Sequence, residues 1–428
     1  MNYEEYKIKL RDRSEALYHP DSRSRRRWYQ HDIDVIVYSD MFRKMQRKSQ
    51  LLSINDPIAR SRLIHTFEVV RIAKEISEKL GLNPELTEAI ALAHDFGNVA
   101  YGKSADLFLI NMTNKLFKHE EISALMSKVF SARLIPDKYR EEAVDACKNS
   151  QNEVKRIKIK EFSFFLEAFK YNDEYYYSCM SPEVIDGIIK HGTENTAFTL
   201  EGQVVNYADN IAYLVQDISD FEATNIFKKS DCDRYSRCLD EIASKDDNKE
   251  YPLSGIVGMT TSIRTATLIE RYVSHNLNLL TNNGYESIYS DIFGDEIPVL
   301  QIPELLQDAL NLCWKFKEEF YLNDLIKLSN MESETKISQI WSILEEGSLF
   351  CENNKSFLQF KKLLNSPIYT SYKKGKKDSL GTKWNDNTWQ QWEKACFIAH
   401  LTCDEIDLII NSFLGRDYTF DLSLPTIR

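Results

Sequence analysis

The stretch ALAHDFGNVAYGK (residues 91–103) places a histidine and an aspartate side by side at the end of an apolar helix. An asparagine–proline pair at 83–84 is typical of a helix start, and the pattern that follows predicts a helix running to Gly97. His94 and Asp95 then lie about 100° apart on this helix, so both can reach one ion near its end. Apolar residues would pack better here, so the pair indicates a function.

Apolar residues recur every three to four positions on both sides of this stretch, which predicts further helices. One helix, stopped by Gly81, has a stripe consisting of Leu63, Phe67, Val70, Ala73, Ile76 and Leu80. Another runs from about Thr199 to Phe221. The chain holds only 14 glycines and 10 prolines in 428 residues, so few turns interrupt it. With no strand–helix alternation and no repeat, we predict an all-α fold.

Composition favours a globular, intracellular chain. Hydrophobic residues make up 43% and charged residues 28%, and the net charge of −11 argues against a general nucleic-acid binder. No apolar run is long enough for a membrane span, and the first residues have no signal-peptide core, so we expect no membrane partner. The eight cysteines form no CxxC pair, which predicts a reduced, cytoplasmic protein.

Two polar stretches, 228–252 and 373–389, are interpreted as loops or insertions. The first suggests a boundary between two regions. We therefore predict a catalytic core with an N-terminal nucleotide-binding segment over residues 1–225, and a helical C-terminal region over 226–428 packed on that core.

Further residues suited to metal chemistry lie on the flanking helices. His65 stands off the apolar stripe of the preceding helix, and Asp209 lies midway along the helix over 199–221. Tyr213 and Asp217 follow Asp209 at i+4 and i+8, which places all three on one helical face. A divalent metal takes mixed nitrogen and oxygen ligands from several elements. Taken alone, however, His65 is better explained as a buried core histidine, and the helix face as a contact with another helix.

Four segments resemble the HD-domain deoxynucleoside triphosphate triphosphohydrolases, the dGTPase-like family. These segments are YSDMFRKMQRKSQ (38–50), ARSRLIHTFEVVRIAKEI (59–76), AIALAHDFGN (89–98) and VVNYADNIAYLVQDISD (204–220). The resemblance covers roughly residues 24–221 and is thin beyond. It implies an HD-domain helical bundle with additional C-terminal helices.

The resemblance assigns the family's metal ligands to His65, His94, Asp95 and Asp209. The cofactor it implies is a divalent ion: Mn²⁺, Mg²⁺ or another transition metal. In this family the metal polarises the α-phosphate and activates the attacking water. The implied reaction converts a deoxynucleoside triphosphate to deoxynucleoside and inorganic triphosphate.

The resemblance also assigns residues to proton transfer and to the substrate. The segment FKHEEIS (117–123) puts His119 beside the leaving group, with Asp106 as its partnering acid; the alternative for His119 is a surface helix histidine. Tyr213 and Asp217 are assigned to the deoxyribose. The remaining substrate contacts implied for phosphate, sugar or base are Arg43, Lys44, Gln50 and Arg62.

The sequence departs from the family in the loop after the His–Asp pair. The family pattern H-D-L-G-H-x-P-F-G-H has two further histidines, where this chain has Asn98 and Lys103. Lysine stays charged at neutral pH but does not readily give up a proton. We therefore assign Lys103 to electrostatic stabilisation of the triphosphate and Asn98 to the substrate wall. Gln216 and Val35 also replace a family histidine and arginine.

These departures leave two alternatives open: a nucleotide sensor or regulatory subunit, and an HD phosphohydrolase acting on another nucleotide. The partners that we expect are a deoxynucleoside triphosphate, an effector nucleotide and further copies of the chain in a homo-oligomer. A cluster of arginines could contact a subunit or effector, although a solvated charge run is favoured. This cluster consists of Arg23, Arg25, Arg26 and Arg27.

Overall fold

The structure of the 428-residue chain is a computed structural model. The described residues are 1–16, 27–50, 60–135, 140–147, 155–158, 165–171, 174–178, 180–192, 195–217, 229–245, 252–253, 261–321, 324–345, 360, 364–380 and 386–413. Most of them are helical, and the predicted all-α class is confirmed.

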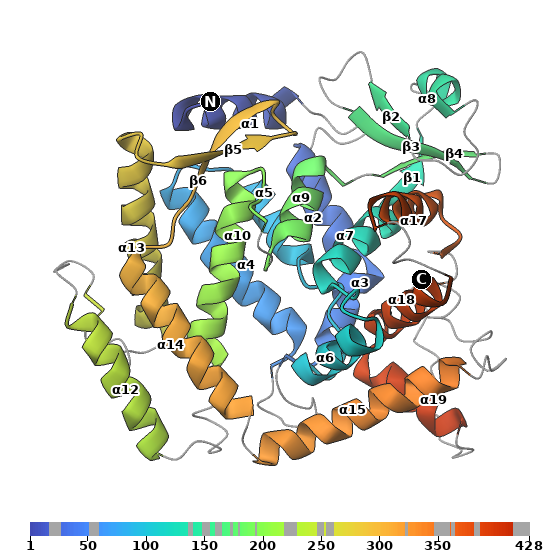
Figure 1. The fold of residues 1–428 in the computed structure, drawn as a ribbon. Helices are drawn as coiled ribbons and strands as arrows, with labels where there is room; N and C mark the ends of the chain where they lie inside the picture. The colour runs from blue at the N-terminus through green and yellow to red at the C-terminus, as the bar shows by residue number, and fades with distance from the viewer. Residues whose placement is uncertain are drawn as a thin grey trace, which may run out of the picture.

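A bundle of helices forms the centre of the molecule (Figure 1). Helix α4 (Arg62–Lys79) packs against α5 (Pro84–Ala93) and α10 (Leu200–Ala212), and α9 (Pro182–Lys190) packs against α5, α10 and α7 (His119–Phe130). Around them lie α1 (Tyr3–Ala16), α2 (Trp28–Val37), α3 (Asp40–Lys44), η1 (Met45–Arg47) and α6 (Lys103–Met112).

Side-chain caps begin the central helices. Asn83 Oδ1 accepts hydrogen bonds from the backbone N–H groups of Glu85 and Leu86, both at 3.0 Å, at the start of α5. Thr199 Oγ1 accepts one from Gly202 N–H at 3.1 Å at the start of α10. The predicted helix starts near 83 and 199 are therefore correct.

The predicted helix ends were too long. Helix α5 ends at Ala93, so His94 caps it and Asp95 lies in the following turn. Helix α10 ends at Ala212 and continues as a π-helical turn, η3 (Tyr213–Asp217). The i, i+4, i+8 alignment assumed an α-helix throughout, so its spacing does not hold across η3.

The predicted stripe of α4 was also incomplete. Phe67 is half exposed, whereas His65, Thr66 and Val69 are fully buried. The reason is that α5 and α10 both cover α4, which buries a wider arc of its surface than one amphipathic stripe. His65 therefore lies on the buried face rather than off it.

Two small antiparallel sheets were not predicted. Strands β1 (Ala132–Leu134), β2 (Lys155–Lys158), β3 (Phe165–Tyr171) and β4 (Glu174–Ser178) form one sheet in the order β1-β4-β3-β2, beside α8 (Arg140–Cys147). Strands β5 (Glu286–Ser290) and β6 (Asp295–Val299) form a hairpin over α1. Both lie at the edge of the bundle (Figure 1). Strands this short give little periodic signal.

The C-terminal half adds further helices around the bundle: α12 (Lys229–Ala243), α13 (Thr261–Thr281), α14 (Glu304–Tyr321), α15 (Asp324–Glu345), α17 (Pro367–Leu380), α18 (Asp386–His400) and α19 (Cys403–Phe413). The interpretation of 228–252 and 373–389 as loops was wrong over much of their length. These helices are polar but amphipathic: α12 buries Tyr235 and Leu239, and α18 buries Trp389 and Trp392.

The C-terminal helices share the core of the bundle. Helix α13 packs against α4 and α10, α15 against α6 and α19, and α17 against α7. One cluster of buried apolar side chains extends from Tyr3 to Ile410. The division at residue 225 stays a prediction. Within the described residues, no helix is both long and apolar enough to cross a membrane.

Candidate metal centre and nucleotide pocket

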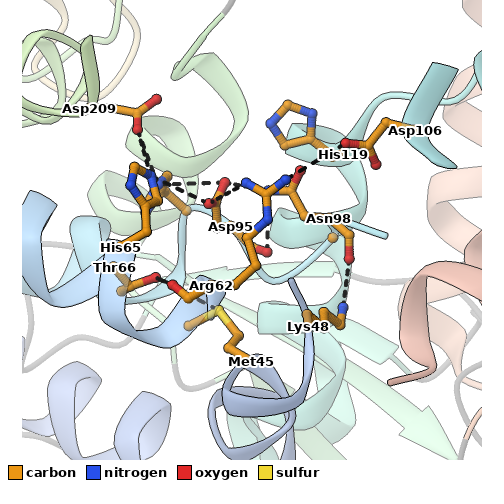
Figure 2. A network of polar contacts seen from close by, with 12 residues as sticks. Met45, Lys48, Arg62, His65, Thr66, Asp95, Asn98, Asp106, His119 and Asp209 are labelled. Atoms are coloured by element: carbon orange, nitrogen blue, oxygen red, sulfur yellow. Dashed lines mark hydrogen bonds and ion pairs between the residues drawn. The ribbon is translucent and has the colours of Figure 1, made fainter. Parts of the chain in front are cut away.

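Four predicted ligand side chains converge between α4, the turn after α5, and α10. Figure 2 shows three of them, His65, Asp95 and Asp209. His65 Nε2 lies 3.0 Å from Asp209 Oδ1 and 3.8 Å from Asp95 Oδ2. His94 Nε2 lies 3.5 Å from Asp95 Oδ1 and 3.8 Å from Asp209 Oδ1. Protein ligands about 2.0–2.2 Å from one metal ion are separated from each other by distances of this order.

The chemistry of these four groups fits a divalent metal. The Nδ1 of His94 donates to the carbonyl oxygen of Ala91 at 2.7 Å, which leaves a lone pair on Nε2. That Nε2 is buried and has no hydrogen-bond partner among the residues that the structure describes. Ligand atoms of His65, His94 and Asp95 all lie within 4.8 Å of one another. Two imidazoles and two carboxylates suit a divalent transition metal.

The two carboxylates of the centre are held in their charged form. Burial would raise the pKa of Asp95, but His94, Arg62 and His65 outweigh it and hold that pKa well below its usual range. The pKa of Asp209 is lowered in the same way, by its contact with His65. Both side chains are therefore ionised at neutral pH, as metal ligands must be.

Asp95 also accepts hydrogen bonds from two neighbouring polar side chains. Its Oδ2 accepts a hydrogen bond from Arg62 Nη1 at 3.2 Å, and its Oδ1 accepts one from Asn98 Nδ2. Arg62 Nη2 lies 3.9 Å from Asp106 Oδ2 (Figure 2). The guanidinium therefore links Asp95 to Asp106.

His119 and Asp106 face the same cavity but do not form a direct pair. Asp106 Oδ1 accepts a hydrogen bond from the backbone N–H of Val99 at 3.1 Å, and no hydrogen bond joins it to His119 among the described residues. His119 Nδ1 lies 3.6 Å from Glu120 Oε1. Burial lowers the pKa of His119, against the opposing charges of Asp95 and Asp106.

A pocket of about 380 Å³ opens beside the metal centre. Of the predicted site residues, the pocket is lined by Gln50, Arg62, Asn98, Lys103, Asp106, His119, Asp209 and Tyr213. The ring of Tyr213 stacks on His65 with centroids 4.9 Å apart. Gln50 is buried, and within the described part of the chain neither the oxygen nor the nitrogen of its side-chain amide has a hydrogen-bond partner. The pocket thus combines cations, acids and an aromatic ring.

Several predicted site residues are not brought to this pocket. Arg43 is exposed and pairs with Asp40 at 3.6 Å, and Lys44 Nζ binds Glu405 at 3.1 Å. The long side chain of Lys44 reaches α19, a contact that the local sequence does not indicate, and its assignment to the substrate stays a prediction. The side chain of Asp217 lies outside the described residues.

Most of the arginine cluster cannot be placed either. Arg23, Arg25 and Arg26 fall outside the described part of the chain. Arg27 pairs with Glu85 at 2.6 Å.

Five further residues of the pocket wall were not predicted from the sequence. They are His191, Gly192, Asn206, Asn210 and Trp314. The segment KHG (190–192) ends α9 with a glycine at φ +63°, and that helix end carries His191 into the cavity. Burial and His94 lower the pKa of His191 to about 4. Trp314 comes from α14 and gives no local signal.

The HD domain family matches residues 62–214, the segment that contains all four converging side chains. This part of the chain is therefore an HD domain. The described residues within it place a His/Asp cluster where a divalent metal could bind.

Curated relatives carry the comparison further. The chain is 32% identical over 204 residues to a deoxyguanosinetriphosphate triphosphohydrolase-like protein of Caldanaerobacter subterraneus subsp. tengcongensis, covering 47% of this chain and 48% of the relative. It is 34% identical over 207 residues to the protein of that description in Clostridium tetani, with the same coverage. The chain thus spans about half the length of these relatives. The resemblance to the dGTPase-like proteins is confirmed, and it supports a phosphohydrolase family.

Proposed function

We propose that this protein hydrolyses deoxynucleoside triphosphates to deoxynucleoside and inorganic triphosphate, using a divalent metal ion. The observation that carries the proposal is the convergence of four side chains, His65, His94, Asp95 and Asp209, beside a cavity. Cationic, amide and aromatic side chains line this cavity, and they suit the phosphates and the sugar of a nucleotide. The printed descriptions of the relatives support the nucleotide class.

His65, His94, Asp95 and Asp209 would hold the ion, and when bound it would supply Lewis-acid activation of the α-phosphate and of a water molecule. Arg62 and Lys103 provide the cationic wall for the triphosphate. Arg62 is buried and anchored by Asp95, so its guanidinium is fixed before a substrate arrives. Lys103 begins α6 and lies with its Nζ 5.6 Å from the ring centre of Trp314, at the cavity wall. Asn98 completes this wall through its bond to Asp95.

Tyr213 carries the preference for deoxyribose in this proposal. Its ring is held against His65 and lines the pocket, so it would meet a 2′-hydroxyl group. Gln50 offers an unpaired donor and acceptor to the sugar or base. His119 and Asp106 remain the groups for proton transfer at the leaving oxygen, acting across the cavity rather than as a hydrogen-bonded pair.

The test incubates the purified protein with each dNTP and each NTP, with Mn²⁺ or Mg²⁺, and separates the products by chromatography. We expect nucleoside and triphosphate from dNTPs, and much slower turnover of NTPs. Tyr213→Ala is expected to bring the turnover of dNTPs and NTPs closer together. The control is Tyr289→Ala, at an exposed tyrosine of β5, which is expected to keep the wild-type difference between the two rates. Release of orthophosphate, or equal rates on dGTP and GTP, would contradict the proposal.

The oligomeric state and the regulation of the protein are inferred from the family resemblance alone. A homo-oligomer, an effector nucleotide and a cytoplasmic location remain predictions. Light scattering of the purified protein measures the oligomeric state. The rate of hydrolysis of one dNTP, with and without a second dNTP, tests for an effector nucleotide.

A further inference from the structure

Trp314 is a tryptophan of α14 that is 39% exposed, although its neighbours on the same helix are buried. Leu310, Cys313 and Phe316 pack into the core, whereas Trp314 lies on the wall of the pocket beside the metal centre. A tryptophan is on average among the most buried side chains of a protein. Its exposure on the wall of a polar cavity therefore indicates a ligand with a flat apolar surface.

Three rings lead from the metal centre to Trp314. The ring of Tyr213 stacks on the candidate metal ligand His65, with centroids 4.9 Å apart and planes inclined by 29°. The ring of Trp314 follows, with its centroid 6.0 Å from that of Tyr213 and an inclination of 50°. Helix α14 packs against η3, the turn that begins with Tyr213, so the backbone holds these two rings together. A nucleotide carries its α-phosphate, sugar and base in this same order.

We propose that Trp314 is the surface on which the nucleobase of the substrate stacks. Every base has a π-face, so such a surface accepts all four bases, and it favours those that stack most strongly. A purine covers more of the indole than a pyrimidine does. The two purine dNTPs are therefore the substrates that bind most tightly, and this contact does not discriminate adenine from guanine. The proposal rests on the proposed function, which it deepens by naming the base-binding residue and the substrate class.

Lys103 connects the base surface with the phosphate wall. Its Nζ lies 5.6 Å from the ring centre of Trp314, within the range of cation–π attraction. A triphosphate is a stronger partner for an ammonium group than a ring is, because hydrogen bonds between two charged groups are the strong ones. Lys103 has a flexible stem, so a bound triphosphate draws it toward the phosphates and leaves the face of the indole to the base.

The two halves of the chain contribute different parts of this pocket. The metal centre lies within residues 62–214, the segment that matches the HD domain, and Trp314 lies a hundred residues beyond its end. The base surface therefore comes from the C-terminal helices. Its chemistry can differ from that of other HD domains without any change at the metal centre.

The experiment reads tryptophan fluorescence of the full-length protein at a fixed concentration of Mn²⁺. The probe is a dGTP analogue with a methylene group in place of the 5′ oxygen, so the bond that hydrolysis would break is absent. Its fluorescence effect is compared with that of inorganic triphosphate, which has no base. Four other described tryptophans are buried: Trp28, Trp341, Trp389 and Trp392. We expect quenching by the analogue, little quenching by triphosphate, and loss of the base-dependent quenching in Trp314→Phe.

Calorimetry measures the affinities. Trp314→Leu keeps an apolar side chain without a π-face, and we expect it to bind the dGTP analogue about 10-fold more weakly, with unchanged affinity for inorganic triphosphate. Trp314→Phe keeps a ring and is expected to retain most of the affinity. The matching dCTP analogue should bind more weakly than the dGTP analogue to the wild type, and equally to Trp314→Leu. The control is Tyr289→Leu, at an exposed tyrosine of β5, which should keep the wild-type affinities.

Equal quenching by triphosphate and by the dGTP analogue would overturn the stacking role, as would wild-type affinity for the analogue in a folded Trp314→Leu protein. An equal loss of affinity for both ligands would overturn it too, because Trp314 would then only pack the pocket wall. The result is separate from the proposed reaction. Base-dependent quenching without dNTP hydrolysis would contradict only the proposed function, and hydrolysis without such quenching would contradict only the role of Trp314.

Discussion

Asp95 serves the fold and the candidate metal centre with the same two oxygen atoms. It faces the imidazoles of His65 and His94 and accepts hydrogen bonds from Arg62 and Asn98. Removing one partner of a buried ion pair costs about 3–5 kcal/mol, because the other charge stays buried. A substitution of Asp95 would therefore lower stability as well as metal binding.

A substitution of Asp209 separates the loss of metal binding from the loss of stability better than a substitution of Asp95 does. Asp209→Asn keeps the shape of the side chain and an oxygen facing His65, but it removes the charge that a metal ligand supplies. We expect hydrolysis to fall by at least the roughly 10- to 100-fold that loss of an outer-shell partner of a metal causes, while the free energy of unfolding changes by about 1 kcal/mol. Steady-state rates and chemical denaturation measure the two quantities. Asp291→Asn, at an exposed position of the β5–β6 turn, is the control, and full activity in Asp209→Asn would contradict the assignment.

At the scale of elements, the turn after α5 is pressed against the start of α7. Gly97 N–H donates to Ser123 Oγ at 2.8 Å, and a Cβ at Gly97 would overlap the carbonyl oxygen of His119. Farther along the same segment, Tyr101 adopts φ +68°, which is unusual for a side chain of its size. The close contact brings the turn after the His–Asp pair against the start of α7, which carries His119.

Gly97→Ala is expected to force these two elements apart. Overpacking of this kind costs about 1–3 kcal/mol, and the added methyl meets backbone atoms that cannot rotate away. We expect a lower melting temperature and a loss of hydrolysis. Gly284→Ala is the matched control, because its Cβ would meet only ordinary contacts at 3.4 Å. Equal melting temperatures for the two variants would contradict the close packing.

The contact between α1 and α10 makes stability depend on pH. Glu201 is buried, and although hydrogen bonds from Tyr6 and from Asn83 N–H act against it, burial raises the pKa of Glu201 from 4.5 to about 7. The folded protein then binds more protons than the unfolded chain between these values. Stability is therefore expected to fall as the pH rises from about 4.5 to about 7, by about 3 kcal/mol in total, and to level off above.

Glu201→Gln removes this titration. We expect the variant to lose the decline in the free energy of unfolding between about pH 5 and about pH 7 that the wild type shows. Chemical denaturation across this range provides the comparison, with Glu286→Gln on exposed β5 as the control. The assignment fails if both variants keep the wild-type slope.

At the scale of the whole molecule, the C-terminal half supports the HD-domain loop. The buried Lys48 donates from Nζ to the carbonyl oxygens of Phe96 (3.2 Å), Asn98 (2.6 Å) and Ala399 (2.6 Å). Tyr101 donates to Asp407 of α19 at 2.8 Å. The recognised similarity covers about half of the chain, yet the other half holds the loop in place.

Lys48→Met tests this support. Methionine fills much of the same space, but it leaves three carbonyl groups without their buried donor, which is expected to cost about 3–5 kcal/mol of folding free energy. Hydrolysis should fall together with stability, because the loop carries Asn98 and Lys103. Lys315→Met, at an exposed lysine of α14, is the control. A variant with wild-type stability would show that the loop does not depend on Lys48.

Local patterns in the sequence determined a large part of this protein. Helical periodicity and caps predicted the all-α class and the starts of α5 and α10, because these signals act over a few residues. The resemblance supplied His65, His94, Asp95 and Asp209 as one group, and the structure brings them together. The two sheets and the helices α12 and α18 escaped prediction, because short strands and polar helices have weak local signals.

The tertiary structure alone decided which side chains share the cavity. His191 reaches the centre through the packing of α9 on α7 and α10, and Trp314 reaches it from α14, far along the chain. Long-range packing also turns Lys44 to α19, where it contacts Glu405, 361 positions along the chain. These contacts join elements that do not follow one another in the sequence. They depend on how helices pack, which the periodicity of any single helix does not contain.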